Sequence, residues 1–186
     1  GVELFRGEGI FTGADCLRVN EDEITWKDLV IATGSKASIP DISGLSEISY
    51  WTSDQALSIS EAPISLAIIG GGPVSCELAQ IFSRFGTKTT IIEFTNQLAG
   101  AEPAEIASRL ADNLRKDGVT ILLNTEVAGA ELIEGNKSRL TFANGNSLEF
   151  DQVIIATGRH PQTAGLDLSL LGISLGEKGE LLVDEQ

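Results

Sequence analysis

The sequence predicts an α/β fold in which a parallel β-sheet is combined with small antiparallel β-meanders. Two observations lead to this prediction. Residues 65–86 run from a short apolar segment through three glycines into a stretch with apolar residues at helical spacing, which is the pattern of a strand, a turn and a helix. A second pattern repeats: residues 27–35 and 150–159 each form a hydrophobic segment that ends in or just after Ala-Thr-Gly and follows three short strand-like runs.

Residues 1–62 are predicted to hold one meander and one parallel strand, which is the first Ala-Thr-Gly segment. A loop follows at residues 40–44, and Ser53 or Asp54 is placed to cap a short helix that ends before Pro63. The expected strands lie at residues 8–12, 16–19, 23–26 and 29–34.

Residues 63–165 are predicted to form a nearly complete nucleotide-binding domain of the Rossmann-like FAD/NAD(P)-binding type, because strands and helices alternate before a second meander. The second helix begins at Pro103 and places Ile106, Leu110 and Leu114 on one face. Residues 1–62 are then the remnant of a second such domain, and residues 166–186 return toward it. The expected elements are strands at 65–69, 89–93 and 119–123, helices at 74–85 and 103–116, a meander at 127–133, 138–142 and 147–150, and a closing strand up to Thr157.

The glycine turn is typical of a site that binds phosphate. Gly70 allows a tight reversal of the chain, and Gly72 has no side chain to keep a pyrophosphate from the backbone. The helix that follows directs its N–H groups and its positive dipole end at the anion. Ser75 occupies the position of the third glycine of this fingerprint and is small enough for close packing of helix and strand. The alternative is that the glycines form only a tight connection.

Glu93 stands at the end of the second predicted strand, 23 residues after Gly70, close to the roughly 20-residue offset of a ribose-binding acid. Its carboxylate can accept hydrogen bonds from both ribose hydroxyls. Because a 2′-phosphate would meet a like charge, Glu93 favours NAD over NADP. The alternative is that Glu93 is a solvated residue at a strand end.

Composition limits the partners of the chain. A net charge of −14 argues against binding to nucleic acid or to an anionic membrane surface. No apolar run reaches the roughly 18 residues of a membrane span, and a cytoplasmic location is expected. Cys16 and Cys76 are the only cysteines and show no metal-binding spacing, and His160 receives no catalytic role.

Taken together, these motifs resemble the pyridine nucleotide-disulfide oxidoreductases, flavoproteins that include dihydrolipoamide dehydrogenase, glutathione reductase and mercuric reductase. The resemblance covers the whole chain. The stretches at residues 50–57 and 77–86 are most similar to mercuric reductases, whereas Glu93 is more typical of dihydrolipoamide dehydrogenases. The matching motifs are the two Ala-Thr-Gly segments and residues 69–77, 158–161 and 179–185.

The resemblance implies roles for individual residues. Glu77 would lie near the nicotinamide ribose or ring, and Glu93 would bind the adenosine ribose. Pro73 departs from relatives that carry Tyr, Val or Ile there, where an aromatic side chain gates access to the flavin. The residues implied to line the NAD site are Gly70, Gly71, Gly72, Pro73, Val74, Ser75, Glu77, Glu93, Val127 and Gly158, and those implied to lie close to FAD are Gly9, Thr33, Gly34 and Ser35.

The resemblance also implies the activity of an intact enzyme. Hydride would pass from NAD(P)H to FAD and then to a disulfide or metal-ion acceptor, in a homodimer. The redox-active Cys pair and the catalytic His and Glu of the family have no counterpart in this sequence, so no catalytic residue is assigned. The chain is therefore expected to be a fragment that binds small-molecule dinucleotides, NAD above all, but is inactive alone. The alternatives are a non-catalytic NAD-sensing module and a methyltransferase-like nucleoside binder.

Overall fold

The computed structural model describes residues 1–184, which form two compact units. The meander unit comprises residues 1–36 and 159–184, and the sheet unit comprises Ala37–Gly158. Each unit is described by itself.

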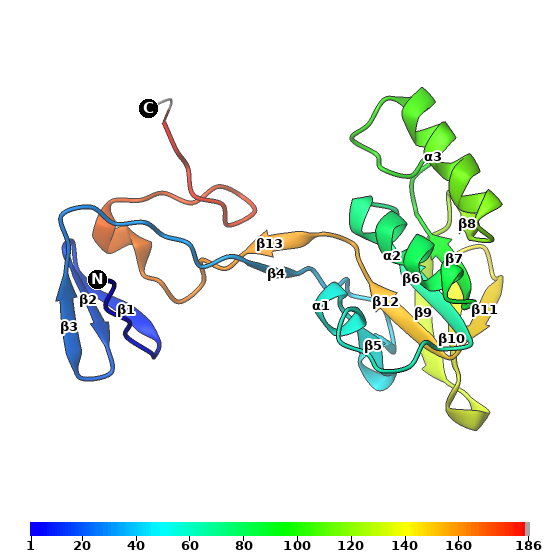
Figure 1. Ribbon diagram of the computed structural model, residues 1–186, viewed down its shortest axis with the longest axis horizontal. Coiled ribbons are helices and arrows are strands. Elements are labelled where there is room, and N and C mark those ends of the chain that lie inside the picture. The colour runs from blue at the N-terminus through cyan, green and yellow to red at the C-terminus, as the bar shows by residue number, and fades with distance from the viewer. Residues whose placement is uncertain (185–186) are drawn as a thin grey trace. The chain divides into compact units, whose positions relative to one another are not determined.

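A five-stranded parallel sheet forms the centre of the sheet unit (Figure 1). The strand order places β6, which precedes the glycine turn, between β12 and β7. The predicted α/β fold with a parallel sheet is thereby confirmed. In spatial order the strands are β5 (Tyr50–Trp51), β12 (Gln152–Ile155), β6 (Ser65–Ile69), β7 (Lys88–Ile92) and β8 (Thr120–Leu122).

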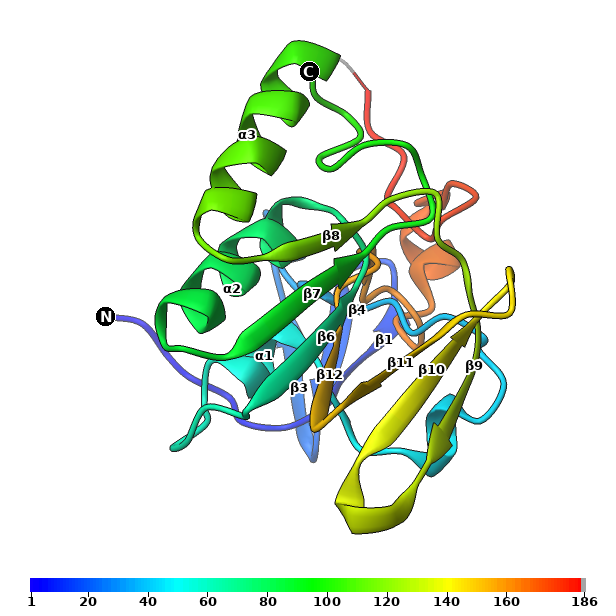
Figure 2. The same ribbon diagram turned by 90° about the vertical axis from the view of Figure 1, so that its right-hand side faces the viewer.

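Helices cover one face of this sheet and a meander covers the other (Figure 2). The helices are α1 (Ser53–Ala56), α2 (Pro73–Arg84) and α3 (Ala104–Lys116). The meander consists of β9 (Val127–Leu132), β10 (Ser138–Phe142) and β11 (Ser147–Phe150), and short 3-10 turns lie at Leu45–Glu47 and Glu134–Asn136.

Successive residues of the central strands enter two different cores. Leu66 and Ile68 of β6 pack with the helices, whereas Ala67 and Ile69 pack with the meander. Because side chains alternate across a strand, a strand covered on both faces must be apolar at every position. This explains the unbroken apolar runs from which the strands were predicted.

A polar pair fixes the alignment of β6 with β12 at their amino ends. The Asp151 carboxylate accepts hydrogen bonds from the Ser65 N–H at 2.9 Å and the Ser65 hydroxyl at 2.5 Å. The Asp151 N–H donates to Ser65 Oγ at 3.0 Å. The strand register follows on, with Leu66 opposite Gln152 and Ile69 opposite Ile155.

The helices differ from expectation in detail. Thr52, rather than Ser53 or Asp54, caps α1, and the Thr52 N–H donates to Oε1 of Gln55 at 2.8 Å. In α3 the buried face is formed by Ala107, Ala111 and Leu114.

The predicted apolar face of α3 was therefore wrong in part. Ile106 is 53% exposed, because the residues that face the sheet follow the spacing 107, 111 and 114. Two alanines on that face let α3 lie close to its neighbours.

The meander unit contains the other predicted meander. Phe11 meets Trp26 edge-on, with ring centroids 5.7 Å apart. Two short strands at its border, β4 (Ser35–Ala37) and β13 (Arg159–Pro161), pair with each other. The meander strands are β1 (Gly9–Gly13), β2 (Cys16–Val19) and β3 (Asp22–Thr25), and a 3-10 turn spans Leu168–Leu171.

The strand predicted at residues 29–34 is wrong, since residues 27–34 contain no strand. Val30 is 86% exposed, while Ile154, at the corresponding place before the second Ala-Thr-Gly, is fully buried. Strand β12 lies between β5 and β6, whereas no strand among residues 1–184 pairs with 29–34. A β-strand forms only where neighbouring strands offer hydrogen-bond partners. Two similar sequences can therefore differ in structure, one as a strand and the other as irregular chain.

The units also divide the chain at other places than the predicted boundaries at 62/63 and 165/166. Residues 37–62 belong to the sheet unit because β5 pairs with β12 and α1 packs on α2. The sheet unit ends at Gly158. Within residues 1–184, every helix is too short or too polar to cross a bilayer.

Candidate functional site

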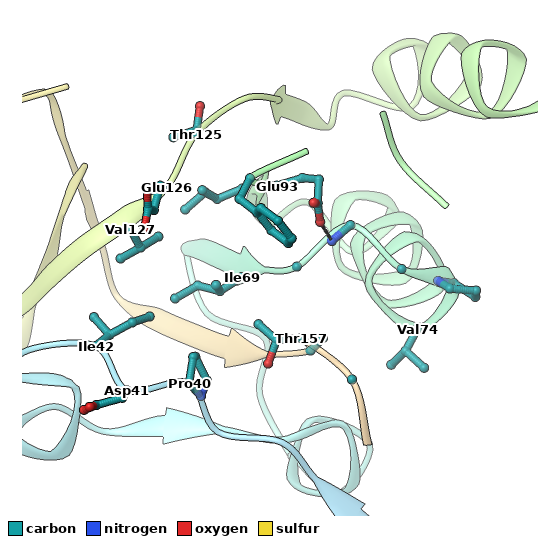
Figure 3. A pocket seen from close by; sticks show the side chains of 18 residues that line it. Pro40, Asp41, Ile42, Ile69, Val74, Glu93, Thr125, Glu126, Val127 and Thr157 are labelled. Carbon is teal, nitrogen blue, oxygen red and sulfur yellow. Dashed lines mark hydrogen bonds between the residues drawn. The ribbon is translucent and has the colours of Figure 1, made fainter. Parts of the chain in front are cut away.

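A cavity of about 470 Å³ opens at the carboxyl ends of the parallel strands of the sheet unit (Figure 3). Ligands of open α/β sheets bind at this edge, where the loops after the strands diverge. Five segments line the cavity: residues 40–42, the glycine turn with its flanks at 69–74, residues 92–94, residues 125–127 and residues 156–158.

Gly70 makes the turn possible by approaching the neighbouring strand closely. Its φ angle is +108°, which disfavours every residue with a side chain, and an added Cβ would lie 2.5 Å from the Ala156 oxygen. Its N–H donates to the Ile92 oxygen at 2.8 Å. Gly70 is thus fixed by the protein itself.

Gly72 has no such reason to be glycine. Its φ angle of −73° suits any residue, and an added Cβ would meet no atom within 4 Å. Gly72 lines the cavity at the start of α2. The empty space that a Cβ would fill is therefore space for something that approaches the backbone from the cavity.

The first turn of α2 offers backbone donors at the same place. The Cys76 N–H donates to the Gly72 oxygen at 3.1 Å, so the intrahelical hydrogen bonds begin there. Pro73 has no N–H, and the N–H groups of Val74 and Ser75 come before Cys76, the first intrahelical donor. These N–H groups and the positive end of the helix dipole are features that favour an anion.

Ser75 lies fully buried behind this turn, with its hydroxyl 3.5 Å from the Ala156 oxygen. It occupies the predicted third glycine position, where α2 approaches β12. Serine is tolerated there because its hydroxyl finds an acceptor on the adjacent chain. Ser75 therefore supports the turn from behind and does not line the cavity.

Glu93 follows β7 at the wall of the cavity and is only 7% exposed. Its Oε2 accepts the Gly71 N–H at 2.5 Å, a contact drawn in Figure 3, and its Oε1 accepts the Thr95 N–H at 2.8 Å. A buried carboxylate needs such partners, since an unsatisfied charge is costly to bury. Each oxygen retains a further lone pair for a ligand hydroxyl.

The charged side chains at the cavity are all acidic. Asp41, Glu93 and Glu126 line it, and among the described residues of its wall there is no lysine or arginine. The remaining surface is largely apolar, with Ile42, Phe94 and Val127 among its members. The start of α2 is thus the one feature of the wall that attracts an anion, and a second anionic group has no cationic side chain to meet.

The structure brings most of the predicted NAD-site residues together. Glu77 is an exception, because it does not line the cavity and is exposed on α2. Ser75 is the other, as described above. The eight that line the cavity are Gly70, Gly71, Gly72, Pro73, Val74, Glu93, Val127 and Gly158.

Sequence reasoning missed several wall residues. Asp41 and its neighbours at 40–42 come from a loop far from the glycines in sequence, which a bridge between Ser43 and Gly129 holds beside β9. Only the tertiary fold reveals them. Phe94 and Thr157 adjoin predicted residues, so their positions after two parallel strands gave a usable signal.

The residues predicted to lie close to FAD fall in the meander unit, which has its own cavity of about 700 Å³. Gly9 and Thr33 line it, together with Lys36, Lys178 and His160. Gly34 and Ser35 do not line it. Ser35 instead accepts hydrogen bonds from the Arg159 guanidinium, at 2.9 Å on its hydroxyl and 2.6 Å on its carbonyl.

Both cysteines are free thiols. Burial in α2, and secondarily the charge of Glu77, raises the pKa of Cys76 to about 11, so this thiol is protonated at neutral pH. Cys16 is half-buried in the meander unit. Within residues 1–184 no group of three or more metal-ligating side chains gathers.

Comparisons with known proteins agree with this geometry. The family model described as pyridine nucleotide-disulphide oxidoreductase matches residues 1–186. Mercuric reductase from Staphylococcus aureus is 35% identical over 189 residues, covering 100% of this chain and 34% of that protein. Dihydrolipoamide dehydrogenase from Chaetomium thermophilum is 33% identical over 197 residues, covering 100% of this chain and 39% of that protein.

A solved structure is similar in fold as well. The HOCl-induced flavoprotein disulfide reductase RclA from Escherichia coli matches with a TM-score of 0.88 at 34% identity. The match covers 96% of this chain and 41% of that chain. The chain therefore spans less than half the length of these relatives.

Proposed function

The chain belongs to the pyridine nucleotide-disulphide oxidoreductase family, and from that premise we propose that its sheet unit binds the pyridine nucleotide, NAD(H), in the cavity at the glycine turn. The observation that carries the proposal is Gly72. Nothing in the protein requires glycine there, yet the position faces the cavity beside the donors of α2. A pyrophosphate seated on those donors needs that space.

The residues of the cavity wall also suggest where the other parts of the dinucleotide lie. Glu93 accepts hydrogen bonds from the hydroxyls of the adenosine ribose, because its carboxylate is fixed at the cavity wall and each oxygen has a further lone pair. Val127 and Phe94 offer apolar surface to the adenine. Gly158, at the end of β12, faces the other part of the dinucleotide.

We propose that NAD is preferred to NADP. A 2′-phosphate on the adenosine ribose would stand beside Glu93, and no cationic side chain of the described wall compensates it. Like charges at such a distance cost several kcal/mol when solvent is excluded, so the binding constants are expected to differ by at least about tenfold.

In the whole protein, the activity that we propose is transfer of hydride equivalents from NAD(P)H by way of FAD to a disulfide or metal-ion acceptor. FAD, when bound, supplies the two-electron step between hydride donor and acceptor. This chain contributes the binding site for the nucleotide, in which the start of α2 binds the phosphates and Glu93 orients the ribose. Gly9 and Thr33, at the cavity of the meander unit, are the residues that we propose for contact with FAD.

Calorimetric titration of this chain with NADH and NADPH tests the proposal. We expect saturable binding of NADH and weaker binding of NADPH. Absence of heat with both nucleotides would refute the proposed site, and tighter binding of NADPH would refute the role given to Glu93.

We also propose that this chain alone is inactive as an enzyme, because no catalytic residue is assigned to it. NADH absorbance should stay constant when the chain is mixed with FAD and either a disulfide or mercuric ion. Steady NADH oxidation above the rate without protein would contradict this.

A further inference from the structure

Gly71, the central glycine of the turn, is hydrogen-bonded through both of the peptide groups that flank it. Its N–H donates to Oε2 of Glu93 at 2.5 Å, and its carbonyl accepts the Ala99 N–H at 2.7 Å. The N–H belongs to the peptide group between Gly70 and Gly71, and the carbonyl to the one between Gly71 and Gly72. Because each peptide group is planar, the two hydrogen bonds restrain both groups that flank the Gly71 Cα. The orientation of Gly71 in turn determines the direction in which Gly72 and the start of α2 face.

These contacts also explain why residue 71 is glycine. A Cβ there would lie 2.8 Å from both Cγ and Oε2 of Glu93, and 2.9 Å from Cδ2 of Leu98. Both Leu98 and Glu93 are buried, so a methyl group at residue 71 would have to displace one of these side chains from its packed position. Gly71 is therefore required by the side chains that pack on the turn, whereas no protein atom requires glycine at residue 72.

We propose that Glu93 is a positioning residue for the phosphate-binding turn, in addition to its contact with the ribose. Through Gly71 it aligns Gly72 and the first N–H groups of α2 with the phosphate. This inference rests on the proposed function, since it concerns the same cavity. The added claim is that Glu93, which contacts the adenosine ribose, also influences how tightly the turn binds the phosphate.

The chemistry of the side chain supports this dual role. Two backbone N–H groups, those of Gly71 and Thr95, point at the two oxygens of one buried carboxylate. An amide has one oxygen and one NH₂ group, so glutamine at this position would face one of the two N–H donors with a donor of its own. Glu93→Gln therefore loosens the turn or its flanking loop while leaving the side-chain volume unchanged.

A ligand without adenosine separates the two roles. Reduced nicotinamide mononucleotide has a phosphate but no second ribose for Glu93 to contact. If Glu93 serves only the ribose, Glu93→Gln leaves the affinity for this mononucleotide unchanged. If Glu93 also positions the turn, the affinity falls, by about tenfold for the loss of one charge-assisted hydrogen bond.

The experiment is an NMR titration of the full chain, which measures weak binding and reports on the turn before any ligand is added. In ligand-free Glu93→Gln we expect shifted amide resonances at residues 71–75 and at Ala99, with faster hydrogen exchange at Gly71. Glu102→Gln is the matched control, because it removes an exposed carboxylate from the loop that follows β7 but does not line the cavity. The control should match the unmodified chain in both respects.

A double-mutant cycle with Gly71→Ala tests whether the two residues act through one contact. The added methyl group displaces the carboxylate from the turn. The double variant should therefore lose no more affinity for the mononucleotide than whichever single variant binds it less tightly. Additive losses would overturn the proposal, as would unchanged turn resonances in Glu93→Gln or unchanged mononucleotide affinity. If the unmodified chain bound neither NADH nor the mononucleotide, the proposed function would fail, and the ligand-free resonances would still decide whether Glu93 positions the turn.

Discussion

Adjacent glycines in the turn have different physical origins. Gly70 is fixed by a positive φ angle and a close approach to Ala156, and Gly71 by Glu93 and Leu98. Gly72 alone is free of such contacts. Substitutions at these positions therefore separate folding from ligand binding.

Gly72→Ala is expected to fold normally and to lose NADH binding. The methyl group meets no protein atom but occupies the approach of the phosphate, so the dissociation constant should rise by about tenfold or more. Calorimetry measures the affinity, and circular dichroism with thermal melting checks the fold.

Gly100→Ala is the matched control for this prediction. Its added Cβ also meets no atom within 4 Å, and Gly100 lies outside the cavity wall. Equal affinity losses in the two variants would show that the effect of Gly72→Ala is not steric exclusion of the ligand.

Cys76 should resist alkylation in the folded chain. Because its pKa is raised to about 11, the reactive thiolate is scarce at pH 8, and burial blocks access as well. Mass spectrometry after treatment with iodoacetamide should find the label on the half-buried Cys16 and only after unfolding on Cys76. Rapid labelling of Cys76 at pH 8 in the native chain would contradict the assigned environment.

Residue roles were predictable in part. The spacing of Gly70, Gly72 and Glu93 identified three wall residues, because the fingerprint is local in sequence. Asp41 was not predictable, since its place at the wall depends on contacts between distant segments. The role of Glu77 near the nicotinamide came from the resemblance alone, and it stays a prediction because this exposed residue does not line the cavity.

Among the elements, the two Ala-Thr-Gly segments show what a sequence pattern leaves undetermined. The same apolar run yields the buried strand β12 in one place and irregular chain with an exposed Val30 in the other. The strands at 65–69, 138–142 and 147–150 were predicted with their observed bounds, because each has its partners within the sheet unit. The hydrophobic pattern thus predicted where strands can form, and the presence of partner strands determined which of them did.

For α3, the structure predicts opposite outcomes for two aliphatic residues that sequence periodicity had grouped together. Leu114 is 1% exposed in the core, so Leu114→Ala should lower the free energy of unfolding by about 2–5 kcal/mol. Ile106→Ala at an exposed position should change it by less than about 0.5 kcal/mol. Urea denaturation followed by circular dichroism measures both, and similar losses for the two variants would contradict the observed helix orientation.

For the whole molecule, charge dominates long-range behaviour. A net charge of −14 and three acids at the cavity repel an anionic nucleotide, and the attraction of α2 acts only at short range. Salt screens the long-range repulsion, with a Debye length of about 8 Å at physiological ionic strength.

Added salt is therefore expected to strengthen nucleotide binding. The affinity for NADH should rise when sodium chloride is raised from about 20 to about 200 mM, and the affinity for NADPH, with its additional phosphate, should rise by a larger factor. Titrations at several salt concentrations measure this. A steady fall of affinity with salt would indicate cationic side chains at the ligand, contrary to the acidic wall.

The hydrogen-bonded pair of Ser65 and Asp151 has a consequence at the opposite edge of the sheet. Both faces of β6 and β12 are apolar, so sliding one strand past the other by one residue would still bury hydrophobic side chains, and burial alone cannot select the alignment. The polar pair selects it, because only one alignment satisfies the carboxylate. That alignment also sets Gly70 against Ala156. A polar contact at the amino ends of the two strands thus determines which residues meet at the cavity, at their carboxyl ends.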